Sequence, residues 1–183
     1  MKGTRVLWFT GISGAGKTTI ANALSQVLSS KDLTSKIIDG DVVRAEQHAH
    51  LGFTPGDIRE NNRLVAELCV KHCGLYDYIL VPIISPFKQS REQAKVIIGE
   101  GFREIYVKIS LKEAIRRDTK GLYKKALNGE INNFIGIDPN VPYEEPINPY
   151  LLLDSEHETL AECIERISDC LDLDRKLIKN TDR

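Results

Sequence analysis

Residues 6–28 read VLWFTGISGAGKTTIANALSQVL, and this stretch decides the fold. The short apolar run Val6–Phe9 predicts a strand, and Lys17–Leu28 carries its apolar residues at helical spacing. Between them, Gly11–Thr18 has the two glycines, the lysine and the hydroxyl residue of a phosphate-binding loop. A strand, such a loop and a helix in this order predict a site for a nucleoside triphosphate.

The residue types in this loop suit phosphate. Glycines allow tight turns that bring backbone N–H groups against phosphate oxygens, and the helix that starts near Lys17 adds the positive end of its dipole. Lys17 is expected to reach the β- and γ-phosphates of the nucleotide, and Thr18 to ligate Mg²⁺. A glycine-rich turn with a chance lysine would not explain the strand and the helix on either side. The residues predicted to bind the triphosphate are Gly11, Ser13, Gly14, Ala15, Gly16, Lys17, Thr18 and Thr19.

Beyond the loop, short apolar runs alternate with longer amphipathic stretches. Further strands are expected at 37–38, 78–84, 105–109 and 150–153, and further helices from Pro55, at 89–98, 111–117 and 120–127, and after Glu158. The alternation predicts an α/β fold of the phosphate-loop nucleoside triphosphate hydrolase type, a three-layer parallel sheet with helices on both faces. Residues 1–183 are interpreted as a single domain, with a lid at about 116–149 that includes a long ordered loop at 128–149.

Composition narrows the class of protein. The chain has 183 residues, of which 42% are hydrophobic and 28% charged, and these fractions exclude disordered proteins. Its 25 Lys and Arg against 26 Asp and Glu exclude polybasic nucleic-acid binders. Its apolar runs are too short to span a bilayer, and its first residues lack a signal-peptide pattern. The four cysteines stand at helical spacing and are expected to be core or inert thiols: Cys69, Cys73, Cys163 and Cys170. We expect a cytoplasmic protein without nucleic-acid or membrane partners.

The net charge is near zero because a basic segment and an acidic segment offset each other. Lys112–Lys125 holds six basic and two acidic residues, whereas Asp154–Asp174 holds eight acidic and one basic. A basic lid fits a site for anionic nucleotides, and the acidic segment is expected to be a solvated outer face of a helix.

Several motifs bear on the use of the triphosphate. The guanine-reading Asn-Lys-x-Asp of GTPases is absent, and a short chain with one phosphate loop and a lid fits a small-molecule kinase, because a lid excludes water from phosphoryl transfer. Asp39 and Asp41 follow the second expected strand, at the edge where ligands of such sheets bind. They could hold Mg²⁺ or accept a proton, or form a polar turn only. Arg44, one turn later, could bind a phosphate or sulfate group.

Taken together, these motifs resemble the adenylylsulfate kinase (APS kinase) family over residues 5–154. The matching pieces occur in the family's order: Gly11–Thr18, Asp39-Gly-Asp-x-x-Arg44, Leu51-Gly-Phe53, Glu60-Asn61, Ile84-Ser-Pro-Phe87, Arg117-Asp118, Lys120–Ala126, Phe134–Ile137 and Pro142-Tyr-Glu-x-Pro146. The resemblance implies transfer of the γ-phosphoryl group of ATP to the 3′-hydroxyl of adenylyl sulfate, with Mg²⁺, in sulfate activation. It also implies a homodimer.

The resemblance implies roles for individual residues. Asp41 stands nearest the 3′-hydroxyl, Asp39 supports the metal together with Thr18, and Lys17 and Ser85 complete the catalytic set. Arg117 is expected to approach ATP. The residues expected to bind the acceptor are Arg44, Phe53, Arg59, Asn61, Ile84, Ser85, Lys120 and Phe134. Phe53 and Phe134 would sandwich its adenine, although core packing is the alternative for each ring. For Ser85 we expect acceptor binding and no covalent phosphoenzyme.

One departure from the family stands out. The family's usual Asp-Arg-x-x-Asn becomes Asp57-Ile58-Arg59-Glu60-Asn61, so Ile58 replaces a substrate-binding arginine. Arg59 lies about 100° further around a helix and does not simply substitute. Two alternatives therefore stay open: a kinase of another nucleotide-linked acceptor, such as a modified cytidine diphosphate, and a nucleotide-binding regulator without catalysis.

Overall fold

Five parallel strands form one sheet in the order β2-β3-β1-β4-β5 in the computed structural model, which describes residues 3–173. The strands are β1 (Arg5–Thr10), β2 (Ser35–Ile37), β3 (Tyr78–Pro82), β4 (Phe102–Lys108) and β5 (Leu151–Asp154). The predicted strands are thus present, each within a few residues of its expected place.

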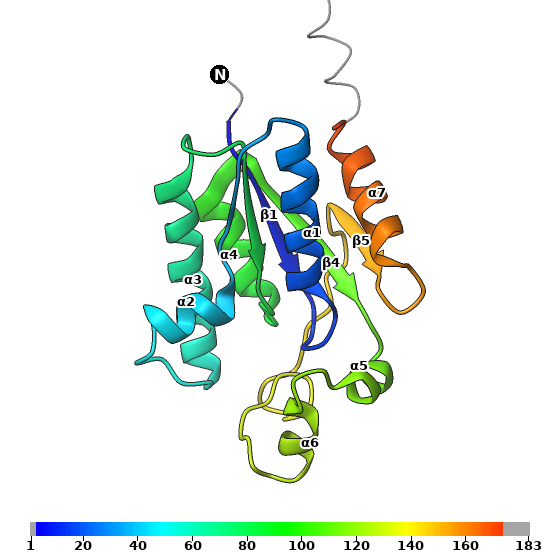
Figure 1. Cartoon of the computed structure of the whole chain (residues 1–183). Helices are drawn as coiled ribbons and strands as arrows, with labels where there is room; N and C mark the ends of the chain where they lie inside the picture. Colours follow the sequence, from blue (N-terminus) through cyan, green and yellow to red (C-terminus); the bar gives the residue numbers. More distant parts are fainter. Residues whose placement is uncertain (1–2, 174–183) are drawn as a thin grey trace, which may run out of the picture.

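Helices cover both faces of this sheet. They are α1 (Lys17–Ser30), α2 (Gly40–Glu46), α3 (Pro55–His72), α4 (Lys88–Ile98), α5 (Leu111–Arg117), α6 (Leu122–Leu127) and α7 (Leu160–Cys170), with a 3₁₀ turn, η1, at Gly99–Gly101. In Figure 1, α1 and α7 lie over one face, and α3 and α4 over the other. The predicted three-layer α/β fold is confirmed.

The alternation of β1 explains the three layers. Successive side chains of a strand point to opposite faces; Leu7 and Phe9 pack in the apolar cluster that includes α1 and α7, whereas Val6 and Trp8 pack in the cluster with α3 and α4. All four are fully buried. Because β1 is central and buried on both sides, its carboxyl end and the loop that follows are held firmly.

The lid lies beyond the carboxyl ends of the strands, where Figure 1 shows α5, α6 and the chain that follows them. Residues 128–149, all of them described, contain neither helix nor strand, as expected. The loop is tied down at its far end, where the Glu144 amide donates to the Pro86 carbonyl at 2.9 Å and the Tyr143 hydroxyl lies 2.9 Å from Thr10 Oγ1. It is therefore an ordered part of the fold.

Three details differ from the expectations. Helix α2 was not expected from the sequence, and α6 begins at Leu122 instead of Lys120. Among the cysteines, which were expected to be core or inert thiols, Cys69 and Cys163 are buried in the core, whereas Cys73 and Cys170 are exposed. Cys73 follows the last turn of α3 with an extended backbone, which breaks the helical spacing.

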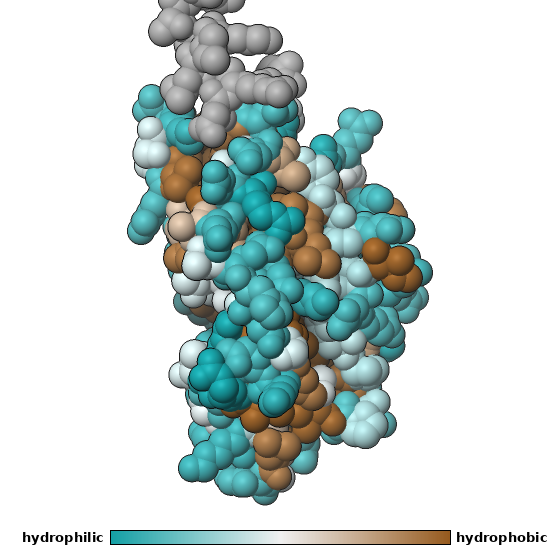
Figure 2. Space-filling view, turned by 90° about the vertical axis from the view of Figure 1, so that its right-hand side faces the viewer, coloured by the Kyte–Doolittle hydropathy of each residue, from teal (hydrophilic) through white to brown (hydrophobic). Residues whose placement is uncertain are grey.

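The outer face of α7 is exposed, as expected for its acidic segment. Figure 2 faces the side of α7 and shows hydrophilic side chains over much of it, and Glu162, Glu165 and Asp169 of this helix are exposed. Among residues 3–173, no helix is long and apolar enough to cross a membrane.

Candidate active site

The phosphate loop connects β1 to α1, and at two positions its backbone path requires glycine. At Gly11 a Cβ atom would lie 2.3 Å from the Val107 carbonyl oxygen, so the loop runs directly against β4. Gly16, the residue before α1, has φ +90° and provides no side-chain cap. The amides of the first turn of α1 are therefore left for a ligand, as anion binding at a helix N-terminus requires.

Lys17 is the first residue of α1, and its side chain reaches back to the start of the phosphate loop. It is 9% exposed, and its ammonium donates to the carbonyl oxygens of Gly11 and Ile12, at 2.8 Å each. Burial lowers the pKa of Lys17 to about 8, against the opposing effect of Asp41. The lysine thus carries a desolvated positive charge at neutral pH, which binds an anion more strongly than a charge in water does.

Thr18 and Asp39 form a pair of oxygen ligands. Thr18 Oγ1 donates to Asp39 Oδ2 at 2.9 Å, while Asp39 Oδ1 caps α2 by accepting from the Asp41 amide at 2.9 Å and the Val42 amide at 3.4 Å. The cap fixes the carboxylate against the phosphate loop. A hydroxyl and a carboxylate are hard oxygen donors, and Mg²⁺ typically takes only one or two protein ligands besides phosphates and water. These residues fit Mg²⁺.

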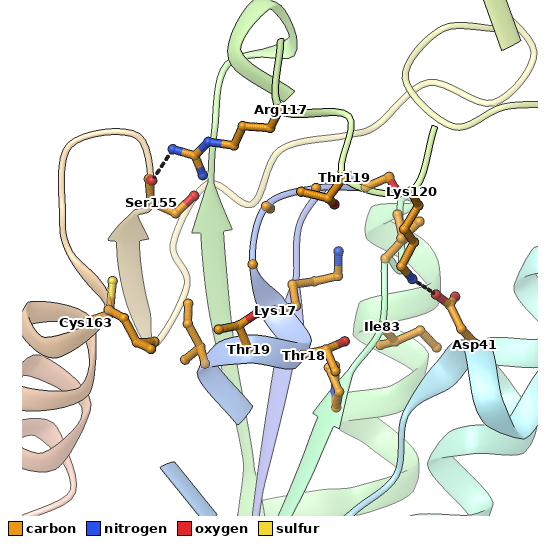
Figure 3. Close-up of a pocket in the computed structure, with 18 of the residues that line it drawn as sticks. Lys17, Thr18, Thr19, Asp41, Ile83, Arg117, Thr119, Lys120, Ser155 and Cys163 are labelled. Atoms are coloured by element: carbon orange, nitrogen blue, oxygen red, sulfur yellow. Dashed lines mark hydrogen bonds and ion pairs between the residues drawn. The ribbon is translucent and has the colours of Figure 1, made fainter. Parts of the chain in front are cut away.

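Asp41 and Lys120 meet from opposite sides of the site. The Lys120 ammonium lies 3.1 Å from Asp41 Oδ2, and the two side chains are 63% and 73% exposed. An exposed pair of this kind contributes little to stability. It matters here because it brings a carboxylate of α2 next to a cation of the lid. Figure 3 shows Lys120 reaching from the lid to Asp41 on α2, with Lys17 between them and the loop.

A cavity of about 440 Å³ joins these groups. It extends from Asp41 and Lys120 past Lys17 to the segment around β5 and α7, at the left in Figure 3. The expected site residues that line it are Ser13, Gly14, Ala15, Gly16, Lys17, Thr18, Thr19, Asp41, Ile84, Arg117 and Lys120. Eleven predicted residues from five separate parts of the chain thus share one space.

Eight residues that line this cavity were not expected from the sequence, some of them at the end near β5 and α7. Arg117 donates to the Ser155 carbonyl oxygen at 2.8 Å and pairs with Glu113. The missed lining residues are Ile20, Pro82, Ile83, Thr119, Ser155, Glu158, Leu160 and Cys163. Ser155 directly follows β5, so its place at the ligand-binding edge of the sheet was available as a signal.

Ile84 and Lys120 line the cavity, but the other residues expected to bind the acceptor lie outside this lining: Arg44, Phe53, Arg59, Asn61, Ser85 and Phe134. Arg44 donates to the Gly52 carbonyl oxygen, and its guanidinium lies 4.7 Å from the centre of the Phe53 ring, which is 54% exposed. Burial lowers the pKa of Arg44. Asn61 is buried, with Oδ1 2.9 Å from His48 Nδ1. Phe134 packs edge-on against Tyr123 at 5.0 Å, so the two phenylalanines have different neighbours.

Ile58 and Arg59 have separate environments, as their 100° offset predicts. Ile58 is 2% exposed and packs in a small cluster with Phe87 and Val141, against which Ile135 of the lid also packs. The Arg59 guanidinium lies 4.7 Å from the centre of the Phe87 ring. Position 58 is thus an apolar contact between α3 and the lid.

Ser85 is buried at the end of β3. It is 1% exposed with φ +46°, and Oγ has no hydrogen-bond partner among the residues described. Its carbonyl oxygen accepts from Arg91 at 2.9 Å and from Thr10 Oγ1 at 3.2 Å. The structure therefore holds the Ser85 backbone firmly, while the hydroxyl lies outside the cavity lining.

Comparisons with known proteins agree with this geometry. A family model described as adenylylsulphate kinase matches residues 3–154. The adenylyl-sulfate kinase of Oceanobacillus iheyensis is 43% identical over 163 residues, which cover 88% of this chain and 81% of that protein. The adenylyl-sulfate kinase of Bacillus velezensis is 44% identical over 165 residues, covering 90% and 83%.

Solved structures agree as well. The structure of the Mycobacterium tuberculosis APS kinase in complex with AMPPNP and APS has a TM-score of 0.86 and 35% identity, covering 94% of this chain and 99% of that chain. A gluconokinase from Sinorhizobium meliloti, 13% identical with a TM-score of 0.63, shares the fold alone.

Proposed function

The chain belongs to the adenylylsulphate kinase family, and we propose that its cavity transfers the γ-phosphoryl group of ATP to the 3′-hydroxyl of adenylyl sulfate. The products are ADP and 3′-phosphoadenylyl sulfate. The observation that carries this proposal is the shared cavity in which Lys17 of the phosphate loop, Asp41 of α2 and Lys120 of the lid face one another.

On the ATP side, the backbone amides of Gly14 and Gly16 and the Lys17 ammonium bind the phosphates. Thr18 and Asp39 would hold Mg²⁺, which would neutralise phosphate charge when bound. The hydrogen bond between Thr18 and Asp39 supports this assignment. Arg117, fixed by Glu113 and the Ser155 carbonyl oxygen, lies at the other end of the cavity and contacts the nucleoside of ATP.

On the acceptor side, Asp41 accepts the proton of the 3′-hydroxyl. At the same time the hydroxyl oxygen bonds to the γ-phosphorus, and the bond between that phosphorus and the β,γ-bridging oxygen breaks. ADP leaves with the electron pair of that bond. Lys120 lies beside Asp41 and stabilises the charge that develops on the transferred group. The lid above both residues keeps water from competing with the hydroxyl.

The acceptor itself binds next to Asp41. Arg44 and Asn61 contact its phosphosulfate and adenosine parts, and the exposed ring of Phe53 stacks on its base together with Phe134. Ile84 lines the cavity beside this position. The buried Ser85 supports the same segment through its backbone, with its hydroxyl free to bond an anionic group after a small movement.

Ile58 favours a second candidate acceptor. Its side chain is packed between α3 and the lid, so it supplies no cation, and the Arg59 guanidinium lies over Phe87 instead. Because position 58 supplies no cation for the anionic part of adenylyl sulfate, the second candidate is a different nucleotide-linked acceptor, such as a modified cytidine diphosphate. The intact phosphate loop argues against an inactive regulator.

An acceptor panel separates these proposals. ADP release is measured with adenylyl sulfate, with other nucleotide-linked acceptors and with no acceptor; turnover with adenylyl sulfate is expected to exceed the rest. Turnover of another acceptor alone would overturn the leading proposal. If Arg59 binds adenylyl sulfate, Arg59→Ala raises its KM, whereas Arg103→Ala, which removes a similar contact over Tyr150 at 5.2 Å, leaves it unchanged. An equal KM in both variants would assign Arg59 to packing.

For the whole protein, we propose one domain with a lid at 116–149, a homodimer and a cytoplasmic location. The resemblance to the family supports these proposals. Light scattering on a size-exclusion column tests the dimer.

A further inference from the structure

A buried tyrosine joins the lid to the phosphate loop. The Tyr123 hydroxyl, in the first turn of α6, donates to the Ser13 carbonyl oxygen at 2.9 Å. The two residues stand 110 positions apart, and Tyr123 is 1% exposed. In Figure 1, α6 lies beyond the carboxyl end of β1, so this bond crosses from one functional part of the molecule to the other.

The Tyr123 ring is fixed on several sides. It belongs to the apolar cluster that includes Ile12 and Ala15 of the phosphate loop, and Phe134 meets it edge-on at 5.0 Å. The Asp118 carboxylate accepts from the Tyr123 amide at 2.9 Å and so caps the start of α6. A phenylalanine would fill the same space, so packing does not explain the hydroxyl, which costs free energy to bury unless it is bonded.

The bond acts on the part of the loop that faces phosphate. The Ser13 carbonyl and the Gly14 amide belong to one peptide group, so a hydrogen bond donated to the oxygen polarises the N–H and makes it a better donor. Gly14 lines the cavity and has φ +78°. Burial raises the pKa of Tyr123 to about 12, so the phenol stays protonated and keeps donating at neutral pH.

The same bond sets the position of Lys120. This lysine precedes Tyr123 by three residues, and its ammonium lies 3.1 Å from Asp41. Because the first turn of α6 is bonded to the phosphate loop, the residues just before this helix, including Lys120, are held in a fixed position over the cavity.

We propose that Tyr123 is a positioning residue that holds the lid and the phosphate loop in one arrangement, so that ATP binds tightly and its γ-phosphoryl group is shielded from water. This inference rests on the proposed use of ATP but not on the identity of the acceptor. Loss of the hydroxyl leaves the Ser13 carbonyl without this donor and loosens the lid. Weaker ATP binding and more hydrolysis without acceptor follow.

The test compares Tyr123→Phe with Tyr150→Phe. The control removes the same kind of bond, from a tyrosine hydroxyl to the Cys170 carbonyl oxygen at 2.9 Å, but away from the cavity. The affinity for the ATP analogue AMPPNP is measured by titration calorimetry, and ADP formation without acceptor is compared with transfer. We expect Tyr123→Phe to bind AMPPNP about tenfold more weakly and to raise the ratio of hydrolysis to transfer, with neither change in Tyr150→Phe.

Hydrogen exchange keeps the test decisive if Tyr123→Phe also lowers the melting temperature. Measured well below that temperature, the amides of Gly14 and Gly16 should exchange faster in Tyr123→Phe than in wild type or Tyr150→Phe. Equal affinity, hydrolysis ratio and exchange in both variants would overturn the proposal. If wild type shows no transfer to adenylyl sulfate, the acceptor proposal fails, while analogue affinity and amide exchange still test Tyr123.

Discussion

Asp41 stands in the first turn of α2, which Asp39 caps, and its carboxylate lies within 3.1 Å of the Lys120 ammonium. If it accepts the proton of the attacking hydroxyl, Asp41→Ala should lower kcat about 10²–10⁴-fold, the usual contribution of a general base. AMPPNP affinity should hold within about twofold, because the phosphate loop is untouched. Steady-state kinetics and calorimetry measure the two quantities.

The control for this substitution is Asp169→Ala, which removes an exposed carboxylate from α7. It should change neither quantity. Near-normal turnover in Asp41→Ala would remove the proposed role of this carboxylate.

The low pKa of Lys17 predicts that nucleotide affinity depends on pH. Burial lowers its pKa from 10.5 to about 8, so the free protein loses this charge as the pH rises through 8. AMPPNP affinity should therefore fall by up to about tenfold per pH unit above that point, whereas Lys17→Met should bind weakly with a flat profile. A flat wild-type curve between about pH 7 and 9.5 would contradict the low pKa.

The low pKa of Lys17 affects the free energy of unfolding in the opposite direction to its effect on nucleotide affinity. Between pH 8 and 10.5 the folded chain binds fewer protons at Lys17 than the unfolded chain. The cost of burying the ammonium is thus fully present below pH 8 and is relieved as the pH rises, so the contribution of Lys17 to the unfolding free energy increases with pH. The lysine destabilises the fold where it binds best.

Among the elements, α4 depends on the lid for its first turn. Its own N-cap residue, Phe87, offers no side-chain acceptor, and the Lys88 amide donates instead to Glu144 at 2.6 Å. Glu144→Ala should lower the unfolding free energy by about 1 kcal/mol, as measured by urea denaturation. Glu92→Ala, which removes an exposed carboxylate 3.7 Å from Lys88 Nζ, serves as the control; equal losses would mean that Glu144 is no cap.

Elements with strong periodicity were predictable from the sequence. The Val6–Phe9 run and the glycines after it fix the central strand and the loop, because buried strands and phosphate loops leave few other choices. By contrast, α2 has seven residues with Val42 exposed and only Gly40 and Val43 buried. Its cap at Asp39 looks the same in a sequence as a polar turn, so periodicity could not reveal it.

The site was predictable to the extent that motifs define it. The loop residues, Asp41 and Lys120 converge as expected. Glu158 and Leu160 were missed because this end of the cavity depends on how the segment after β5 packs, and no local pattern encodes that. The link from Tyr123 to Ser13 was missed for the same reason, since a long-range contact leaves no spacing to read.

At the scale of the whole molecule, charge is separated. The lid segment Lys112–Lys125 is basic, and the described part of the α7 segment is acidic. This separation should draw anionic nucleotides toward the cavity, so kcat/KM for ATP should fall about threefold as salt rises from about 50 to 300 mM. Lys125→Glu should lower kcat/KM at low salt, whereas Lys71→Glu, at the far end of α3, should not. Equal effects would mean that only net charge matters.

The lid is bonded to the β1–phosphate-loop segment at both ends, through Tyr123 and Tyr143. A stretch of chain closed in this way has already lost most of its conformational freedom before any ligand arrives. Nucleotide binding then orders little further chain, and the heat-capacity change measured for binding should reflect the buried ligand surface alone. The lid therefore loses its conformational entropy during folding, and this loss is not repeated in each catalytic cycle.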